Sequence, residues 1–327
     1  MKITASAPGK LVLFGDHAAV YGKPCLVTAV DLRFSTTVEP LDEPVVEIST
    51  PQLREQGETY RVQRDAVSAR NRRETAFVEA ALRQLIDRYK VTSGFHVDTE
   101  GPQVTFGLGS SSAIAAATLV AAAQQLKLEI DKREIFDLVY AAVLDVQGTG
   151  SGVDVAAAVY GGTVYYVNRG DMIERLPDSH LPIVIGYSGS KVSTTNLIGD
   201  VARLRDRQPD FMHTLLHMLG DMSVQARDHI LHENWQAFGD LMNIHQGILD
   251  GFGVNTLQLA RLIFAAREAG ATGAKISGAG GGDCMFALAV ESTRSSVTEA
   301  IQQADGTPVD IATGADGVRL ETTSHKA

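Results

Sequence analysis

The distribution of apolar and polar positions divides the chain into a strand-rich beginning and a helix-rich remainder. Alternating or continuous apolar runs, which are typical of strands, occur at residues 2–7, 11–14, 25–31, 34–39, 44–49, 58–63 and 94–99. The segment ETAFVEAALRQLIDRYK then places its apolar residues at helical spacing, which predicts an amphipathic helix. A later helix is predicted after Asp131, because Asp131 and Glu134 have the spacing of a capping box.

The second half of the chain continues the combination of strands and helices. A strand predicted at 162–167 ends at a polar turn, residues 168–171, where we place the boundary between a domain of residues 1–170 and a domain of residues 171–327. Beyond this turn, strands are predicted at 183–188, 273–277, 283–289, 308–313 and 317–322, and helices near 194–205, 210–230, 233–249, 256–268 and 294–303. Helices that pack on a sheet in this way predict the α+β fold class.

Length and residue usage narrow the class of protein. A chain of 327 residues is long enough for two domains, each with its own core. No apolar stretch reaches the roughly 18 to 20 residues of a membrane span, and the first residues lack the pattern of an export signal, so we expect a cytoplasmic protein. Cys25 and Cys284 lie in apolar surroundings, which favours buried free thiols over a disulfide or a metal pair.

The net charge of −10 argues against binding to nucleic acid or to an anionic membrane, because the average surface would repel both. An anionic ligand would therefore need positive potential from local groups. Lys10, Lys275 and helix N-termini are the candidates that the sequence offers.

The segment TFGLGSSSA at residues 105–113 joins an apolar approach to a glycine-serine turn and an alanine-rich run. This order predicts a strand that leads through a turn into a helix near 110–126. The unpaired N–H groups and the positive dipole end of such a helix suit a polyphosphate. An ordinary capped helix after a hairpin is the alternative. The chain has no G-x-x-x-x-G-K-S/T sequence, which excludes a Walker-type phosphate loop.

Two further segments are considered together with TFGLGSSSA: APGKLVLFGDHAAVYGKP at 7–24 and GAKISGAGGGDC at 273–284. In sequence and order the three resemble the signature motifs of the GHMP kinases, and the first is most similar to the version in mevalonate kinases. The resemblance implies a ribosomal-protein-S5-like N-terminal domain for ATP binding and catalysis, and a ferredoxin-like α/β C-terminal domain that completes the site. It also implies a transferase that uses ATP with Mg²⁺ to phosphorylate a small hydroxylated acid such as mevalonate, in isoprenoid biosynthesis. For the assembly of the protein, the resemblance is compatible with a homodimer.

One acidic residue, Asp154, stands directly before the apolar residues of GTGSGVDVAAAVYGG. A buried carboxylate needs a cation nearby, and Lys10 is the natural partner. In the kinases that this chain resembles, the aspartate of S-G-x-D is the base for the acceptor hydroxyl and the lysine of A-P-G-K lies beside it. The resemblance therefore assigns Asp154 and Lys10 as catalytic residues. The alternative is that Asp154 only caps the helix that follows.

The same resemblance assigns both glycine-rich segments to the nucleotide. The residues expected to bind ATP are Gly107, Leu108, Gly109, Ser110, Ser111, Ser112, Gly278, Ala279, Gly280 and Gly281. The hydroxyl of Ser111 is also expected to ligate Mg²⁺. The second segment could instead be a plain loop, but the residues on both sides of it are strand-like and a hairpin needs far fewer glycines.

The acceptor is expected to contact Asp16, His17 and Thr194. Asp16 and His17 occupy the glutamate and histidine positions of the first motif, with a shorter acid here. Thr194 falls in SKVSTTNLI, which is similar to a substrate-proximal segment of mevalonate kinases. Lys191 and Lys23 are candidates to neutralise an acid on the acceptor.

The chain departs from the mevalonate kinase pattern at Val143, where the resemblance implies a magnesium-binding glutamate. Asp145 and Gln147 are candidate substitutes, and we favour Asp154 together with water. The run VQGTGSGVDVAAAVYGG is also similar to phosphomevalonate kinases, so phosphomevalonate or another small alcohol is the alternative acceptor. A decarboxylase that first phosphorylates a tertiary hydroxyl and a ligand sensor without turnover are two further alternatives.

Overall fold

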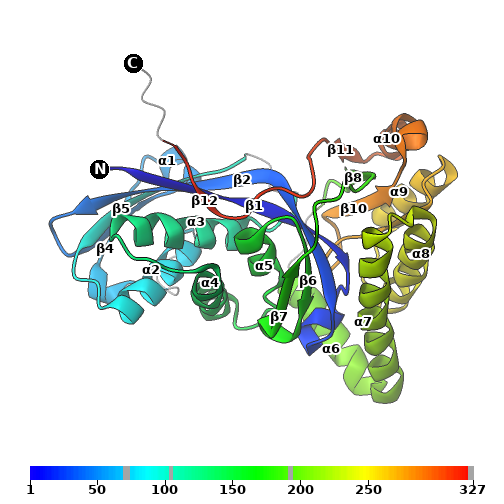
Figure 1. Ribbon diagram of the computed structural model, residues 1–327, viewed down its shortest axis with the longest axis horizontal. Helices are drawn as coiled ribbons and strands as arrows, with labels where there is room; N and C mark the ends of the chain where they lie inside the picture. Colours follow the sequence, from blue (N-terminus) through cyan, green and yellow to red (C-terminus); the bar gives the residue numbers. More distant parts are fainter. Residues whose placement is uncertain (69–73, 103–105, 191–193, 323–327) are drawn as a thin grey trace.

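Two layers of strands and helices, linked by one long β-hairpin, form the protein (Figure 1). The computed structural model describes residues 1–68, 74–102, 106–190 and 194–322. The linking hairpin consists of β1 (Ile3–Phe14) and β2 (Cys25–Leu41). It begins in the larger sheet and ends against the smaller one, so both layers are built on the same two strands.

Eight strands within the described residues form the larger sheet, in the order β12-β1-β2-β5-β3-β4, with β6 paired to β2 and β7 paired to β6. Besides β1 and β2, its strands are β3 (Val45–Ser49), β4 (Tyr60–Gln63), β5 (Gly94–Glu100), β6 (Thr163–Val167), β7 (Met172–Arg175) and β12 (Arg319–Leu320). The strands are antiparallel except for the pair of β3 with β5.

β2 runs for 17 residues, where the sequence pattern predicts two separate strands. Its pairing with β1 slips between Pro8 and Gly9, so that Asp31 and Leu32 are extra residues on β2. Such a bulge changes the face that the side chains take. The continuous buried run therefore ends at Asp31, and the strand continues beyond it with alternating burial.

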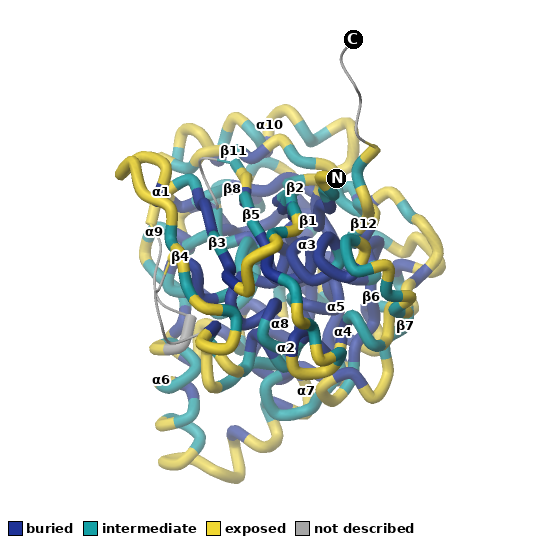
Figure 2. Tube along the Cα trace, turned by 90° about the vertical axis from the view of Figure 1, so that its left-hand side faces the viewer, coloured by how far each residue is buried: buried dark blue, intermediate teal, exposed yellow. Residues whose placement is uncertain are grey.

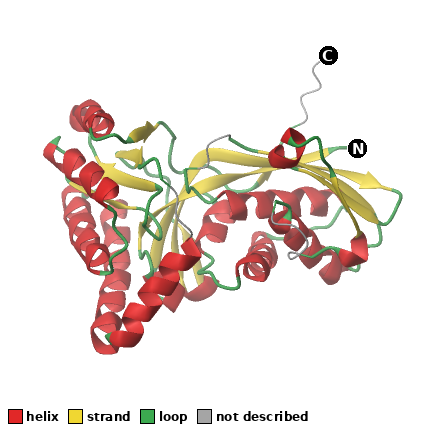
Figure 3. Cartoon of the chain, turned by 180° about the vertical axis from the view of Figure 1, so that it is seen from behind, coloured by secondary structure: helices red, strands yellow, loops and turns green. Residues whose placement is uncertain are grey.

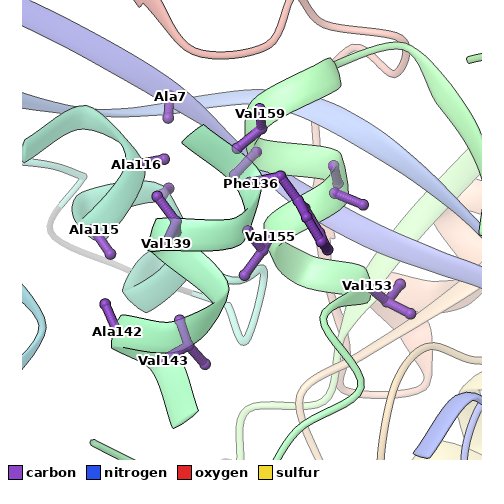
Figure 4. Packing of buried hydrophobic residues seen from close by; sticks show 14 of the residues in the cluster. Ala7, Ala115, Ala116, Phe136, Val139, Ala142, Val143, Val153, Val155 and Val159 are labelled. Carbon is purple, nitrogen blue, oxygen red and sulfur yellow. The ribbon is translucent and has the colours of Figure 1, made fainter. Parts of the chain in front are cut away.

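Helices cover one face of the larger sheet, and α3 lies along β1 and β2 (Figure 1). They are α2 (Ala76–Tyr89), α3 (Ser110–Gln125), α4 (Lys132–Gln147) and α5 (Val153–Tyr160). Figure 4 shows the cluster of buried side chains beneath them, in which Phe136, Val139 and Val143 of α4 lie close to Val155 and Val159 of α5. This packing fixes α5, the helix that carries Asp154, against the sheet.

The smaller sheet is antiparallel, in the order β11-β8-β10-β9. Its strands are β8 (Ile183–Tyr187), β9 (Gly273–Ile276), β10 (Cys284–Leu288) and β11 (Thr307–Val309). The helices of this half are α6 (Thr194–Arg207), α7 (Pro209–Leu231), α8 (Trp235–Gly251), α9 (Leu257–Glu268) and α10 (Glu291–Gln303). Of these, α8, α9 and α10 pack against the smaller sheet, α7 packs on α8 and on the hairpin of β1 and β2, and α6 packs on α7. Figure 3 shows this half from behind.

One apolar core joins the two layers. Leu13 and Leu26, at the far end of the hairpin, are buried together with Ile185, Phe238 and Phe286 of the smaller layer. Figure 2 shows that buried positions run through both layers, whereas α6 projects from them with many exposed residues. A site placed at this junction can receive residues from both halves of the chain.

Most elements agree with the sequence pattern, and the predicted α+β class is confirmed. The predicted cap is also confirmed, since the Asp131 carboxylate accepts the N–H of Glu134 at 2.8 Å. The short helix α1 (Pro51–Glu55) and strand β7 were not predicted, and β11 and β12 are shorter than the predicted strands. The expected approach strand at Val104 and Thr105 lies outside the described residues.

The predicted polar turn is found as the 3-10 turn η3 (Asn168–Gly170). Beyond it, however, β7 pairs with β6 in the larger sheet, and β12 returns to pair with β1. Since contacts cross the turn in both directions, the division into residues 1–170 and 171–327 stays a prediction.

Both cysteines, Cys25 and Cys284, are free and buried, as the sequence predicts. Burial raises the pKa of the Cys284 thiol to about 12. Across the described ranges, no helix combines the length and the apolar character that crossing a membrane requires.

Helix α8 lies unusually close to β9, and we expect Gly239→Ala to destabilise the fold. A Cβ at Gly239 would lie 2.8 Å from the backbone carbon of Thr272, so helix and strand would have to separate. Overpacking of this kind costs about 1–3 kcal/mol, which outweighs the gain of roughly 1 kcal/mol from replacing a helical glycine. Thermal and urea unfolding would measure the loss.

Gly247→Ala on the same helix is the matched control. A Cβ there would meet nothing within 4 Å, so only the favourable helical term of about 1 kcal/mol remains. Equal changes in the free energy of unfolding of the two variants would show that the close approach of α8 to β9 does not limit the residue size at position 239.

Candidate active site

Strand β1 brings Lys10 to the centre of the candidate site. β12 covers the outer edge of β1 only at Ala5 and Ser6, so farther along this strand another segment can dock. There the backbone N–H of Lys10 donates to the carbonyl of Leu108 at 2.7 Å. A Cβ at Gly9 would lie 2.7 Å from the same oxygen, so the glycine permits the approach. The hydrogen bond fixes Lys10 beside the glycine-serine turn.

Lys10 and Asp154 form the pair that the sequence predicts. The Lys10 Nζ lies 3.4 Å from the Asp154 Oδ1, with 11% of the lysine side chain and 43% of the aspartate side chain exposed. The expectation that Asp154 is buried was therefore wrong, because its place in the first turn of α5 leaves the carboxylate open to solvent. A carboxylate that is paired yet accessible can take a proton from a bound hydroxyl.

Two tyrosines hold the glycine-rich loop that leads into α5. The hydroxyl of Tyr140 donates to the carbonyl of Gly150 at 2.8 Å, and that of Tyr166 donates to Ser151 at 2.6 Å. Burial raises the pKa of both phenols, so both stay protonated donors. Because Asp154 follows only three residues after Ser151, these bonds position the carboxylate.

The start of α3 carries the first set of expected ATP residues. Gly109 lies in the left-handed region at the N-cap, and a Cβ there would lie 2.8 Å from the Lys10 Cγ. Ser110 and Ser111 are half-buried in the first turn, so a ligand can reach them, whereas Ser112 is buried. Leu108 places its side chain in the core between the layers, so only its backbone can take part.

The second glycine-rich loop lies between β9 and β10 and is tied to other parts of the chain. Gly278 donates its N–H to the Asp16 Oδ1 at 2.6 Å, and Gly281 donates to the carbonyl of Val254 at 2.7 Å. These two N–H groups are already used, which leaves those of Ala279 and Gly280 as the candidates for phosphate. Gly278 itself lies beside the pair of Lys10 and Asp154, since a Cβ there would be 3.7 Å from the Lys10 Nζ.

Gly280 is constrained by a contact with another part of the protein. A Cβ there would lie 2.4 Å from the carbonyl oxygen of Val254, in the connection between α8 and α9, and the backbone is left-handed. The close approach to Val254 and the left-handed backbone both require a glycine here, and its expected role in binding ATP stays a prediction.

Asp16 and Lys275 form a buried ion pair that the sequence did not predict. Neither side chain has exposed surface, and the Lys275 Nζ donates to the Asp16 Oδ2 at 2.7 Å. Burial lowers the pKa of Lys275 while the Asp16 carboxylate opposes that shift. The Asp16 carboxylate is taken up by partners within the protein, and its contact with an acceptor stays a prediction. Lys275 has no exposed charge to offer an anionic ligand.

His17, the other expected acceptor contact in the first motif, is also engaged by the glycine loop. Its Nε2 lies 3.0 Å from the carbonyl oxygen of Ala279, and since that oxygen can only accept, the ring nitrogen donates. Burial lowers the pKa of His17, which keeps the ring neutral. Thr194 begins α6, but its side chain lies outside the described part of the chain, as does Lys191.

Val143, which stands where the resemblance implies a magnesium-binding glutamate, is surrounded by apolar side chains. Val143 is 5% exposed and packs in the cluster of Figure 4. Asp145 accepts a hydrogen bond from Gln84 of α2 at 2.6 Å, and so faces a different helix from Asp154. No group of three or more His, Cys, Asp or Glu residues in the described ranges is arranged to hold a metal.

Ser111 and Asp154 nevertheless present donors that suit Mg²⁺. One is a half-buried hydroxyl at a helix start and the other is a half-exposed carboxylate. Mg²⁺ prefers such oxygen ligands and keeps several of its positions for phosphate and water, so a sparse set of protein ligands fits it.

Sequence reasoning missed several residues that position the site. Tyr166 lies in an ordinary apolar strand run, which gives no sign of its bond to Ser151. His245 did carry a signal, because it stands on the apolar stripe of α8 between Met242 and Leu249 and is fully buried. Its Nε2 accepts the N–H of Gly15 at 3.2 Å.

Known proteins resemble this chain over nearly its whole length. The family described as GHMP kinases N terminal domain matches residues 76–162, and that described as GHMP kinases C terminal matches residues 226–306. The chain belongs to the GHMP kinases. A mevalonate kinase of Thermococcus sibiricus is 37% identical, covering 98% of this chain and 99% of its own. A mevalonate kinase of Pyrococcus furiosus is 37% identical with the same coverage.

Solved structures show how widely the fold is shared. L. major mevalonate kinase in complex with R-mevalonate matches with a TM-score of 0.75 at 22% identity, covering 95% of each chain. Lactococcus lactis galactokinase complexed with galactose matches with a TM-score of 0.86 at 18% identity, covering 97% of this chain and 95% of its own. Since kinases of different acceptors share the fold, the fold alone does not choose the acceptor.

We expect Tyr166→Phe to lower kcat by about 10-fold, because a small displacement of the Asp154 loop spoils the alignment that phosphoryl transfer needs. The fold should lose only about 1 kcal/mol, the worth of one hydrogen bond. Steady-state kinetics and thermal unfolding measure the two effects. Tyr160→Phe is the control, because the rings of Tyr160 and Tyr166 both lie beside the ring of Phe136. If both variants keep the kcat of the unmodified enzyme, the loop does not depend on Tyr166.

Proposed function

We propose that this kinase transfers the γ-phosphate of ATP to the C5 hydroxyl of mevalonate, giving 5-phosphomevalonate and ADP. The membership in the GHMP kinases makes it an ATP-dependent kinase of a small-molecule hydroxyl. The observation that carries the proposal is the accessible pair of Lys10 and Asp154 between two glycine-rich segments. The full-length similarity to mevalonate kinases supports the choice of acceptor.

In the proposed reaction, Asp154 accepts the proton of the acceptor hydroxyl as its oxygen bonds to the γ-phosphorus and ADP leaves. Lys10, whose Nζ lies 3.4 Å from the Asp154 Oδ1, places a positive charge near the transferred group. Phosphoryl transfer depends mostly on alignment and on neutralising the charge of the phosphoryl oxygens. Alignment and charge neutralisation both need groups that are fixed before the substrate binds. The hydrogen bonds of Tyr140 and Tyr166 to the loop before α5 fix Asp154 in this way.

The phosphates are proposed to lie at the start of α3, against Ser110, Ser111 and the free N–H groups of the first turn. The N–H groups of Ala279 and Gly280 face them from the second loop in this proposal. When bound, Mg²⁺ would be held by the Ser111 hydroxyl and the Asp154 carboxylate, and would neutralise charge on the phosphates.

The acceptor needs a cation for its carboxylate, and the structure offers Arg169. A cavity of about 550 Å³ is lined by Val20, Tyr21, Gly22, Asn168, Arg169 and Asp171. Arg169 is near enough to Tyr140, which holds the loop before Asp154, for its charge to act on that phenol. Lys23 is less suited, because its Nζ bonds the His217 Nε2 at 2.8 Å. Thr194 stays a proposed acceptor contact.

An ADP-release assay with mevalonate, phosphomevalonate, galactose and homoserine tests the proposal directly. We expect mevalonate to give the highest kcat/KM and no carbon dioxide to form. A higher value with phosphomevalonate would overturn the choice of acceptor. Release of carbon dioxide would show a decarboxylase, and absence of turnover with every acceptor would show a sensor.

Asp154→Asn should fold normally and lose at least about 10²-fold in kcat, the usual loss when a general base is removed. The side chain is 43% exposed, so the neutral amide should leave the melting temperature almost unchanged. ADP release and thermal unfolding measure the two quantities. A variant that keeps near-normal kcat would remove Asp154 from the mechanism.

Ser111→Ala should raise the magnesium concentration needed for the half-maximal rate, because one oxygen ligand is lost. Asp145→Asn is the matched control, since Asp145 bonds Gln84 of α2 instead of the catalytic loop. A titration of rate against magnesium compares the two. The opposite result, with only Asp145→Asn shifting the titration, would make Asp145 the ligand that replaces the missing glutamate.

A further inference from the structure

A sealed ionic network lies beneath the second glycine-rich loop. The Asp16 Oδ2 accepts from the Lys275 Nζ at 2.7 Å, and the Asp16 Oδ1 accepts the N–H of Gly278 at 2.6 Å. The Lys275 Nζ also donates to the carbonyl of Ile276 at 2.6 Å. Neither charged side chain has exposed surface, so every partner of this carboxylate is a group of the protein.

The remaining group at this carboxylate is neutral. The His245 Nε2 lies 3.7 Å from the Asp16 Oδ2 and accepts the N–H of Gly15, so its proton is on Nδ1. Burial holds the pKa of His245 well below its usual range. The rings of Phe14 and Phe286 lie over the Lys275 Nζ, at 6.0 Å and 5.2 Å. One positive and one negative charge therefore balance each other in a buried enclosure.

A buried pair of this kind is a weak source of stability, because desolvation offsets most of the attraction between the charges. Its other effect is geometric. Asp16 belongs to the segment that follows β1, and Gly278 belongs to the loop that follows β9, yet one carboxylate oxygen joins them. The same peptide lies beside Lys10, since a Cβ on Gly278 would be 3.7 Å from the Lys10 Nζ.

We propose that Asp16, held by Lys275, is a positioning residue for the nucleotide: it fixes the Gly278 peptide so that the loop is set for ATP, and it does not contact the acceptor. This inference rests on the proposed function only in placing ATP at the loop. Binding of nucleotide in the absence of any acceptor separates the two, because a wrong acceptor would leave that measurement unaffected.

Two double variants isolate the hydrogen bond from the charge. Asp16→Asn with Lys275→Met removes both charges and keeps a side-chain carbonyl for the N–H of Gly278. Asp16→Ala with Lys275→Met removes the carbonyl as well. Neither variant leaves a buried unpaired ion, which makes both better suited to the test than Asp16→Asn alone.

Calorimetric titration with ADP and magnesium, without acceptor, is the readout. The first variant is expected to bind within about 3-fold of the unmodified protein, and the second at least about 10-fold more weakly, the cost of one well-placed hydrogen bond. The KM for mevalonate should be the same in both. Equal nucleotide affinities in the two variants would overturn the proposal. A rise in the KM for mevalonate with unchanged ADP affinity would return Asp16 to the acceptor site.

Hydrogen exchange on the unmodified protein provides a test that needs no variant. The Gly278 amide should exchange slowly without nucleotide, because its N–H is already bonded to a sealed carboxylate. Fast exchange that slows only when ADP is added would show that the nucleotide, and not Asp16, orders this peptide, and would also overturn the proposal.

Discussion

The antiparallel pairing of β1 with β2 is the interaction on which the site depends. Because β2 holds β1 along one edge, the other edge and the end of β1 are free to bind distant segments. The N–H of Lys10 donates to the carbonyl of Leu108, and the backbone of Val12 exchanges two hydrogen bonds with the Ser277 hydroxyl, 265 positions away in the sequence. One rigid strand thus sets the distance between both glycine-rich segments, and neither needs to be positioned by the nucleotide.

The sequence predicts the parts of this site that are encoded locally. Lys10, Asp154 and the start of α3 stand in short segments whose residue types state their chemistry, and the structure brings Lys10 and Asp154 together. Exposure could not be predicted, because it depends on packing between segments far apart in the chain. Asp154 was expected to be buried and is half-exposed, while Asp16 was expected at the surface of the site and is sealed by α8 and β9.

Two lysine–aspartate pairs show how surroundings give the same residue types different uses. Lys10 and Asp154 lie 3.4 Å apart at an accessible surface, where the carboxylate can exchange a proton with a ligand. Lys275 and Asp16 lie 2.7 Å apart with no exposed surface, where any change of charge would leave an unpaired ion in a buried enclosure. The accessible pair suits chemistry and the buried pair suits the placement of a loop.

The pairing of β12 with β1 has a consequence for how the chain folds. Ala5 pairs with Leu320, and Arg33 donates to the carbonyls of Asp316 and Gly317, so the larger sheet is completed by a segment far later in the chain than β1 (Figure 1). Contacts between such distant segments require the closure of a very long loop before they stabilise anything, which slows folding. During synthesis, the edge of β1 stays open until this segment emerges, and an open strand edge is a template for pairing with other chains.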